Sequence, residues 1–236
     1  MFNVIHRGAV STTMDAAREP DVHLGVFDSL LAESQTNGRG QYRRNWGSPA
    51  GNLYASLRLP MEPPFVGTEA AVACGAAVCA ALEGYGYPAV MKWPNDVALM
   101  FGGTPRKVCG ILTEAAPDAA GGLAWVIPGI GINVTPPPGG YPPEIASTAG
   151  AVFPDAAPED AAAKLAVDTL DALIGLYKAM PEQRFHAEYL SRLTLLGREV
   201  SLPDGVHGTV TGIDTDFRLL VSSGGKQLAL DSGEIT

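Results

Sequence analysis

The chain has 236 residues, of which 46% are hydrophobic, so it can bury a core of ordinary size in one large domain with a small appendage. Only 17% of the residues are charged and the formal net charge is −9, which argues against long contacts with nucleic-acid phosphates. The opening MFNVIHRGAV carries no secretion signal and no run of about 18 apolar residues follows, so we expect a cytoplasmic protein without membrane contact.

The first third of the chain predicts short elements followed by one long helix. Thr12 or Thr13 can cap a short helix within residues 8–19, and residues 24–34 are typical of a strand. A polar, glycine-rich loop follows, and residues 52–59 alternate well enough for a second strand. A helix is then predicted to begin near Thr68 and end at Gly84, with alanines that suit close packing.

The middle of the chain predicts the core of a sheet. Four apolar stretches rich in β-branched residues are separated by turns, at 89–93, 96–101, 107–116 and 123–134. Residues 135–147 hold too many prolines to continue a strand or a helix, so they predict a loop that could be mobile.

Two helices and a small β region are predicted to complete the chain. Pro158 suits the start of a helix whose apolar stripe is Leu165, Ala166, Leu170, Leu173, Ile174 and Tyr177. A second helix is predicted to end at Gly197. From Arg198 onward, short strands and tight turns indicate a small β-barrel or sandwich of about 40 residues, so we place a domain boundary near residue 195.

Cysteines and histidines do not predict a metal site. Cys74, Cys79 and Cys109 have no metal-ligand spacing and cannot all pair, so we expect reduced and mostly buried thiols. The four histidines are scattered along the chain, and no zinc site is predicted from them.

The segment TNGRGQYRRNW, residues 36–46, concentrates three arginines and no acid in an acidic chain. Gly38 and Gly40 flank Arg39, and glycines allow a sharp turn that brings backbone N–H groups close to an anion. The guanidinium fork of Arg39 suits a carboxylate or a phosphate. The alternative is an ordinary solvated loop.

Three further segments present polar residues at strand ends. In MKWPNDV, residues 91–97, the proline excludes a helix and leaves Lys92, Asn95 and Asp96 at the end of a strand. In RKVCGILTE, residues 106–114, Lys107 leads directly into an apolar strand, where it could also protect a sheet edge from aggregation. GIGIN, residues 129–133, ends another strand with two glycines and an asparagine.

In this order, the segments GRGQYRRNW, KWPND, KVCGIL and GIGIN resemble the motifs of the biotin protein ligase family. STT at residues 11–13 stands where the family has Ser-Thr-Asn, and the segments GTVTGIDTDFRLLV and SGEI resemble its small C-terminal β domain. The resemblance implies an α/β (α+β) fold: a ligase domain over residues 1–195 with a mixed sheet flanked by helices, and a small SH3-like β domain over residues 196–236.

The resemblance also implies a two-step ligation. The carboxylate of biotin attacks the α-phosphate of ATP to give biotinyl-adenylate and pyrophosphate, and a lysine of a biotin carboxyl carrier-type domain then takes the acyl group. Because the carboxylate and the triphosphate repel each other, this chemistry depends on cations and N–H donors that position them. ATP, biotin and Mg²⁺ are therefore the expected cofactors.

Roles follow for the residues that match the family's motifs. Lys107 would lie between the carboxylate and the α-phosphate, and Arg39 would grip the ligand and its adenylate. The biotin pocket would be lined by Ser11, Thr12, Thr13, Gln35, Gly38, Gly40, Gln41, Gly110, Ile111 and Leu112. The nucleotide side would be formed by Trp46, Arg44, Lys92, Asn95, Asp96 and Asn133. Of these, Trp46 would face the adenine, and Asp96 would help to order the phosphates with magnesium.

Several positions depart from the family pattern. After Gly-Arg-Gly the family continues Arg-Arg-Gly-Arg, whereas this chain reads Gln41-Tyr42-Arg43-Arg44. The family's arginine at position 41 helps to hold the adenylate, so Gln41 is expected to weaken its retention by about 1–3 kcal/mol. Arg43 replaces a glycine and limits the freedom of the loop, and Thr13 replaces the asparagine of Ser-Thr-Asn. Asp216-Phe217 stands where Asp-Gly would make an easy hairpin turn.

Other functions stay open beside biotinylation. A ligase for lipoate, octanoate or another small carboxylic acid fits Thr13 and the altered loop. A protein that binds biotin, a nucleotide or an acyl-adenylate with weak or no transfer fits Gln41 and Arg43. Some related acyl-transfer enzymes use a cysteine nucleophile, and Cys109 would share a face with Lys107 only if the strand is regular.

Two expectations concern partners. STT begins at residue 11, which leaves no room for the DNA-binding module of the repressor-type members, and the net charge is −9, so we expect no DNA binding. An exposed sheet edge could pair two copies of the chain into a homodimer.

Overall fold

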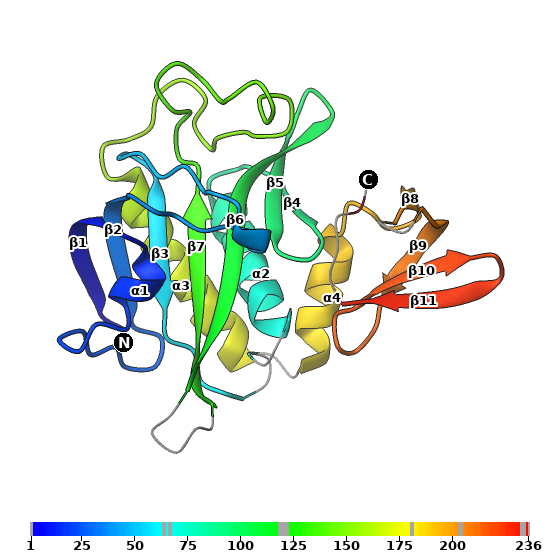
Figure 1. Cartoon of the computed structure of the whole chain (residues 1–236), viewed down its shortest axis with the longest axis horizontal. Coiled ribbons are helices and arrows are strands. Elements are labelled where there is room, and N and C mark those ends of the chain that lie inside the picture. Colours follow the sequence, from blue (N-terminus) through cyan, green and yellow to red (C-terminus); the bar gives the residue numbers. More distant parts are fainter. Residues whose placement is uncertain are drawn as a thin grey trace.

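Two β-sheets organise the chain in the computed structural model, which describes residues 2–62, 65, 68–117, 123–179, 182–202, 205–231 and 235. Figure 1 shows the larger sheet in the N-terminal part and the smaller sheet at the C-terminal end. The mixed α/β fold with a small C-terminal β region is confirmed.

The larger sheet has seven strands in the order β1-β2-β3-β7-β6-β5-β4. Strands β1 and β2 are parallel, and every other neighbouring pair is antiparallel. The strands are β1 Val4–Val10, β2 Ser29–Gln35, β3 Leu53–Leu57, β4 Ala89–Lys92, β5 Asp96–Phe101, β6 Thr104–Pro117 and β7 Leu123–Ile132.

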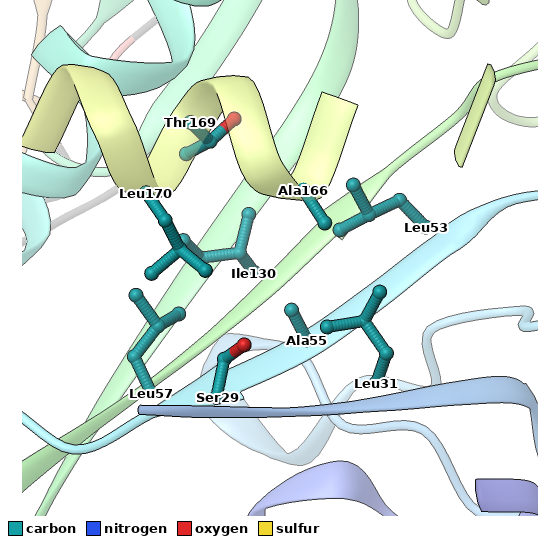
Figure 2. A pocket seen from close by; sticks show the side chains of 9 residues that line it. All are labelled: Ser29, Leu31, Leu53, Ala55, Leu57, Ile130, Ala166, Thr169 and Leu170. Atoms are coloured by element: carbon teal, nitrogen blue, oxygen red, sulfur yellow. The ribbon is translucent and has the colours of Figure 1, made fainter. Parts of the chain in front are cut away.

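Two long helices, α2 (Thr68–Gly84) and α3 (Ala161–Ala179), cover one face of this sheet. Figure 2 shows Leu170 of α3 above Ile130 and Leu57 of the sheet, around a small apolar cavity. The side chains on this face are almost completely buried and form one continuous hydrophobic core with the helices. Burial of this apolar surface is the main stabilising term of the fold.

The opposite face of the sheet has no long helix among the described residues. It carries the single-turn helix α1 (Thr13–Ala16) and the loop that follows β2. Side chains of a strand alternate between the two faces, and the alternation places small residues here on β3, β6 and β7: Ser56, Gly110, Gly129 and Gly131. These small residues leave room for side chains of the loop and of α1 to lie directly on the sheet.

The C-terminal part begins with α4 (Glu182–Arg192), which leads into a four-stranded antiparallel sheet. Its order is β11-β10-β9-β8, with β8 Glu199–Ser201, β9 His207–Ile213, β10 Leu219–Ser223 and β11 Lys226–Leu230. The segment between α4 and β8 is tied to the large sheet, because the Thr194 N–H donates to the Met91 carbonyl at 3.0 Å.

Most predicted elements are confirmed. The helix over 68–84 has the predicted ends, and the four strands of the sheet core lie where the sequence indicated. Strand β1 was not predicted, and the expected strand over 24–34 begins only at Ser29. The helix predicted to end at Gly197 ends at Arg192, because Leu193 and Thr194 instead bond with the edge of β4.

Candidate functional site

The open face of the sheet has a floor made by two paired glycines. Gly110 of β6 and Gly131 of β7 are in register, and the indole of Trp46 lies over both. A Cβ atom at Gly131 would lie 2.7 Å from Trp46 Nε1, and one at Gly110 would lie 3.0 Å from the ring. Any larger residue would displace the indole, so the glycines are required for this close approach.

A β-bulge directs Lys107 onto the same face. Ala98 pairs with Lys107 and Val97 with Cys109, which leaves Val108 as an extra residue on β6. The bulge interrupts the alternation, so Cys109 is buried in the core while the Lys107 ammonium lies 5.0 Å from the centre of the Trp46 ring. Burial raises the pKa of the Cys109 thiol well above its usual value. The strand is not regular at this point, so Cys109 does not share a face with Lys107, and the expected buried thiol is confirmed.

The Lys107 side chain is held by a carboxylate at the start of β5, directly after the β4–β5 turn. Lys107 Nζ lies 2.7 Å from Asp96 Oδ1. The preceding residue, Asn95, is buried: its side-chain Nδ2 donates to the Ile111 carbonyl at 2.5 Å, and its backbone carbonyl accepts from the Ile111 N–H at 3.0 Å. Lys92, at the other end of this turn, is exposed. The turn thus presents one carboxylate to Lys107 in a fixed position.

A network of amides and hydroxyls lines the region beside α1. Gln35 Oε1 accepts from the Thr13 N–H at 2.8 Å, and Gln35 Nε2 donates to Ser48 Oγ at 2.9 Å. Thr13 Oγ1 accepts from the buried Ser56 hydroxyl at 2.9 Å. Thr12 caps α1, since its hydroxyl accepts from the N–H of Asp15 at 3.0 Å. Both threonines and Gln35 are therefore fixed in place.

Four charges gather next to this network. Arg39 Nη2 lies 2.8 Å from Asp15 Oδ1 and 3.4 Å from Glu114 Oε1. Glu114 is in turn paired with Arg18 at 2.8 Å. These side chains are about one-third to one-half exposed, and ion pairs at such positions contribute little stability. A ligand anion could therefore replace Asp15 at the guanidinium of Arg39.

The loop over residues 36–46 folds as a hairpin in front of the sheet. Arg39 and Asn45 form an isolated bridge, and the Trp46 N–H donates to the Gly38 carbonyl at 2.9 Å. Tyr42 at the tip is exposed and has a φ of 55°, a conformation that is rare for an aromatic residue. Gln41 is half-buried and Arg44 is exposed beside Tyr42, whereas the side chain of Arg43 lies outside the described part.

The proline-rich segment after β7 forms the wall beyond Lys107. Asn133 Nδ2 donates to the Gly150 carbonyl at 3.0 Å, and the hydroxyl of Tyr141 donates to the same carbonyl at 2.7 Å. The Gly150 N–H in turn donates to the Lys107 carbonyl at 2.8 Å. Asn133 therefore fixes the end of this loop against the strand that carries Lys107.

Comparison with known proteins agrees with this arrangement. The model of the biotin/lipoate A/B protein ligase family matches residues 28–133. A biotin--[acetyl-CoA-carboxylase] ligase of Mycobacterium tuberculosis is 31% identical over 223 residues, which cover 87% of this chain and 77% of that protein. The chain belongs to the biotin protein ligase family.

Two other similar proteins extend the comparison. The bifunctional ligase/repressor BirA of Bacillus subtilis is 33% identical over 147 residues, which are 61% of this chain but 44% of that protein. The structure of the biotin protein ligase from Aquifex aeolicus in complex with biotin and ATP superposes with a TM-score of 0.78 at 27% identity. That superposition covers 99% of this chain and 97% of the Aquifex chain.

Nine of the eighteen residues assigned by resemblance to the biotin protein ligases come together on the glycine-floored face: Thr12, Thr13, Gln35, Gly38, Arg39, Trp46, Lys107, Gly110 and Leu112. Ser11 is exposed, and the threonines after it make the contacts described above. The Ile111 side chain is buried in the core, and only its backbone takes part through Asn95. Gly40 is part of the loop hairpin, where its N–H bonds with the Arg44 carbonyl.

Sequence reasoning missed several residues of this site, chiefly Asp15, Glu114, Met14 and Tyr141. The sequence contained a positional signal for two of them, Glu114 and Asp15. Glu114 follows Gly110 by four residues on one strand, so regular alternation places it on the same face. Asp15 stands three residues after the cap of α1, where it shares the first turn with Thr12. Met14 covers Gly129, a contact that only the tertiary fold creates.

No helix of the described residues is long and apolar enough to cross a membrane.

Proposed function

We propose that this protein activates biotin with ATP to biotinyl-adenylate and then transfers the biotinyl group to a lysine of a carrier protein. The observation that carries the proposal is the placement of Lys107, which the β-bulge turns toward the glycine floor, next to Trp46 and paired with Asp96. Membership of the biotin protein ligase family and the likeness to a ligase solved with biotin and ATP support it.

The polar network beside α1 is suited to the head of the acid substrate. Thr12, Thr13 and Gln35 offer hydroxyl and amide groups in fixed positions next to an apolar lining that includes Leu112 and Met14. Such a mixture of a few oriented polar groups and apolar walls is typical of small-ligand pockets. We assign the ureido head of biotin to this end of the face.

We assign the carboxylate and phosphate end to Lys107, and we propose that Arg39, which rests beside α1, turns to this end when the ligand binds. The two cations would then offset the repulsion between the acid's carboxylate and the α-phosphate, and hold them close enough to react. When the carboxylate attacks the α-phosphorus, the bond from that phosphorus to the bridging oxygen breaks and pyrophosphate leaves. Lys107 would bind the reacting groups from its position beside Asp96, and Trp46, over the glycine floor, would stack on the adenine.

We assign Mg²⁺ to the phosphate side, where it would neutralise charge on the triphosphate. Mg²⁺ is usually held by one or two carboxylates together with substrate phosphates, and Asp96 supplies one carboxylate there. Among the described residues no group of three or more His, Cys, Asp or Glu side chains could hold a metal by itself. The donor set therefore fits a cation that binds together with the nucleotide.

In the second step the ε-amine of the carrier lysine attacks the acyl carbon, the bond to the phosphate oxygen breaks, and AMP leaves. The amine gives up a proton when the amide forms. We propose a biotin carboxyl carrier-type domain as the acceptor, a cytoplasmic location and no binding to DNA, in line with the net charge of −9. We also propose that an exposed sheet edge pairs two copies into a homodimer.

An assay of acid activation distinguishes biotin from the alternative acid substrates. The protein is supplied with ATP, Mg²⁺ and biotin, lipoate or octanoate in turn, and the release of pyrophosphate is followed. We expect release with biotin alone. Release with lipoate or octanoate instead would favour a ligase for another acid, as Thr13 allows. No release with any acid would favour a protein that binds without activating, as Gln41 and Arg43 allow.

A further inference from the structure

The tryptophan of the KWPND motif reaches the small C-terminal sheet. Trp93 is 4% exposed, and its Nε1–H donates to the backbone carbonyl of Phe217 at 3.0 Å, a residue 124 positions further along the chain. Figure 1 shows the small sheet on the side of the molecule where β4 and β5 lie. The contact joins a motif of the ligand site to the last part of the chain.

The partner of Trp93 stands in an unusual backbone conformation. Phe217 has a φ of 58°, in the left-handed region that favours glycine, yet it is 4% exposed. Its ring packs edge-on against Tyr189 of α4, with the ring centres 6.1 Å apart. Asp214 fixes this turn, since its carboxylate accepts from the N–H of Asp216 at 3.0 Å and of Arg218 at 2.9 Å. Glycine would adopt the turn without strain, but it would provide no ring.

The β4–β5 turn, which carries Trp93, is also anchored to β6. Asn95, two residues after Trp93, is bonded to both backbone groups of Ile111 on β6. Asp96, the next residue, holds the ammonium of Lys107 at 2.7 Å. Trp93, which contacts the small sheet, and Asp96, which sets the position of Lys107, thus lie three residues apart in one short segment.

We propose that Phe217 is a positioning residue for the activation reaction, and that the small sheet is part of the apparatus that orients Lys107. The ring of Phe217 fixes the turn in the small sheet, the carbonyl of this turn holds Trp93, and Trp93 holds the segment that carries Asp96. The proposal rests on the proposed function of Lys107 in binding the reacting carboxylate and phosphate.

The decisive variant is Trp93→Phe, which removes the N–H donor and keeps an aromatic ring. We expect kcat for pyrophosphate release to fall about tenfold, because small misplacements of catalytic groups are costly, while KM for the acid and for ATP changes by less than about twofold. Thr194→Val is the matched control, because it removes the hydroxyl bond to the Met91 carbonyl (3.2 Å) between the same two parts of the chain. Its kcat should stay at the wild-type value.

A second readout does not depend on turnover. The chain has five lysines, at positions 92, 107, 164, 178 and 226, so the Cε signal of Lys107 can be assigned in lysine-labelled protein with a Lys107→Arg variant. We expect its chemical shift to change in Trp93→Phe and to stay constant in Thr194→Val. Should Trp93→Phe not fold, Phe217→Leu tests the same link, because it removes the ring and keeps a large apolar side chain.

Three outcomes would overturn the inference. They are an unchanged Lys107 signal in Trp93→Phe, an unchanged kcat in that variant, and an equal loss of kcat in Thr194→Val. A changed Lys107 signal in a protein whose wild type releases no pyrophosphate with any acid would contradict the proposed function while supporting the link from Phe217 to Lys107. The experiments thereby distinguish a failure of the proposed biotin activation from a failure of the link between Phe217 and Lys107.

Discussion

The loop over residues 36–46 and the turn over residues 93–96 both carry motifs of the biotin protein ligase family, and they are held by different forces. In the loop, Arg39 is paired with Asp15 through side chains that are 35% and 46% exposed. In the turn, Trp93 and Asn95 are 4% and 8% exposed, and each is bonded to a carbonyl of another part of the sheet structure.

The difference indicates that the loop and the turn have separate roles within one site. An exposed ion pair contributes about 0–1 kcal/mol, so the loop can exchange Asp15 for a ligand anion at little cost. A buried hydrogen bond is more costly to lose, because its partner is left unsatisfied, so the turn keeps its geometry throughout the reaction. We infer that the loop changes its contacts to bind the adenylate, while the turn and Lys107 keep their positions.

The largest effect is expected for Lys107→Ala. Loss of a cation that stabilises the reacting charges should lower the rate of pyrophosphate release about 100- to 1000-fold. The side chain is 34% exposed, so the melting temperature should stay close to that of the wild type. Lys178→Ala, an exposed position in the last turn of α3, is the control and should retain full activity. Activity retained in Lys107→Ala would contradict the role assigned to this lysine.

The floor of the site is tested by Gly131→Ala. The new Cβ atom would lie 2.7 Å from Trp46 Nε1, so the indole must move away from the sheet. We expect the affinity for ATP to fall roughly tenfold, or about 1.4 kcal/mol, as measured by isothermal titration calorimetry. Gly8→Ala adds the same methyl group at a β1 position where nothing lies within 4 Å of it, and should bind normally. Equal affinities in the two variants would speak against Trp46 as part of the nucleotide site.

The adaptable loop is tested by Gln41→Arg, which restores the arginine of the family pattern. A charge-assisted hydrogen bond of about 1–3 kcal/mol should slow the dissociation of biotinyl-adenylate about 5- to 150-fold. The rate can be measured by trapping released adenylate after a single turnover. Gln41→Leu, without a charge, should show no such slowing. An off-rate that is the same in the wild type and in Gln41→Arg would exclude this residue from retention of the intermediate.

The smallest effect is expected for Asp214→Asn, a change of melting temperature that depends on pH and arises in the turn that carries Phe217. Burial by itself would raise the pKa of Asp214, but hydrogen bonds from the Arg218 N–H and guanidinium and the Asp216 N–H outweigh it and lower the pKa below 3.8. A lowered carboxyl pKa contributes stability above the unfolded pKa, and this contribution is lost as the pH falls through the folded value.

Asp214→Asn should therefore melt a few degrees below the wild type at neutral pH, since partial exposure keeps the loss near about 1 kcal/mol. The difference should stay constant down to about pH 5 and shrink below about pH 4, as the pH falls from the pKa of the unfolded chain toward the lowered pKa of the folded protein. Thermal scans between pH 3 and pH 7 measure it. A difference that grows on acidification would contradict the lowered pKa of Asp214.

The sequence predicted the helix over 68–84 and the strands of the sheet core because their apolar patterns are local and strong. It could not predict that β6 carries a bulge at Val108, since the bulge depends on how β6 pairs with β5. That one feature decides which face Lys107 occupies and excludes Cys109 from it. Local alternation alone would have placed the two residues together.

The motif residues were found by resemblance, but their partners required the fold. Trp93 stands in the KWPND motif, and nothing in the sequence shows that its indole bonds with Phe217 in the small sheet. Likewise Asp15 and Glu114 come from α1 and β6, and only the tertiary structure brings both to Arg39. Long-range pairs of this kind leave no local pattern for sequence reasoning to use.

The central claim is that Lys107 and the loop around Arg39 serve the transfer of biotin to a carrier lysine. The most direct measurement is the intact mass of a biotin carboxyl carrier domain after incubation with the protein, ATP, Mg²⁺ and biotin, with Lys107→Ala as the blank. We predict that the carrier gains one biotinyl group, only when ATP and biotin are both present, and that the blank leaves it unmodified. A carrier that stays unmodified with the wild type, or gains a lipoyl or octanoyl group in place of biotin, would contradict the claim.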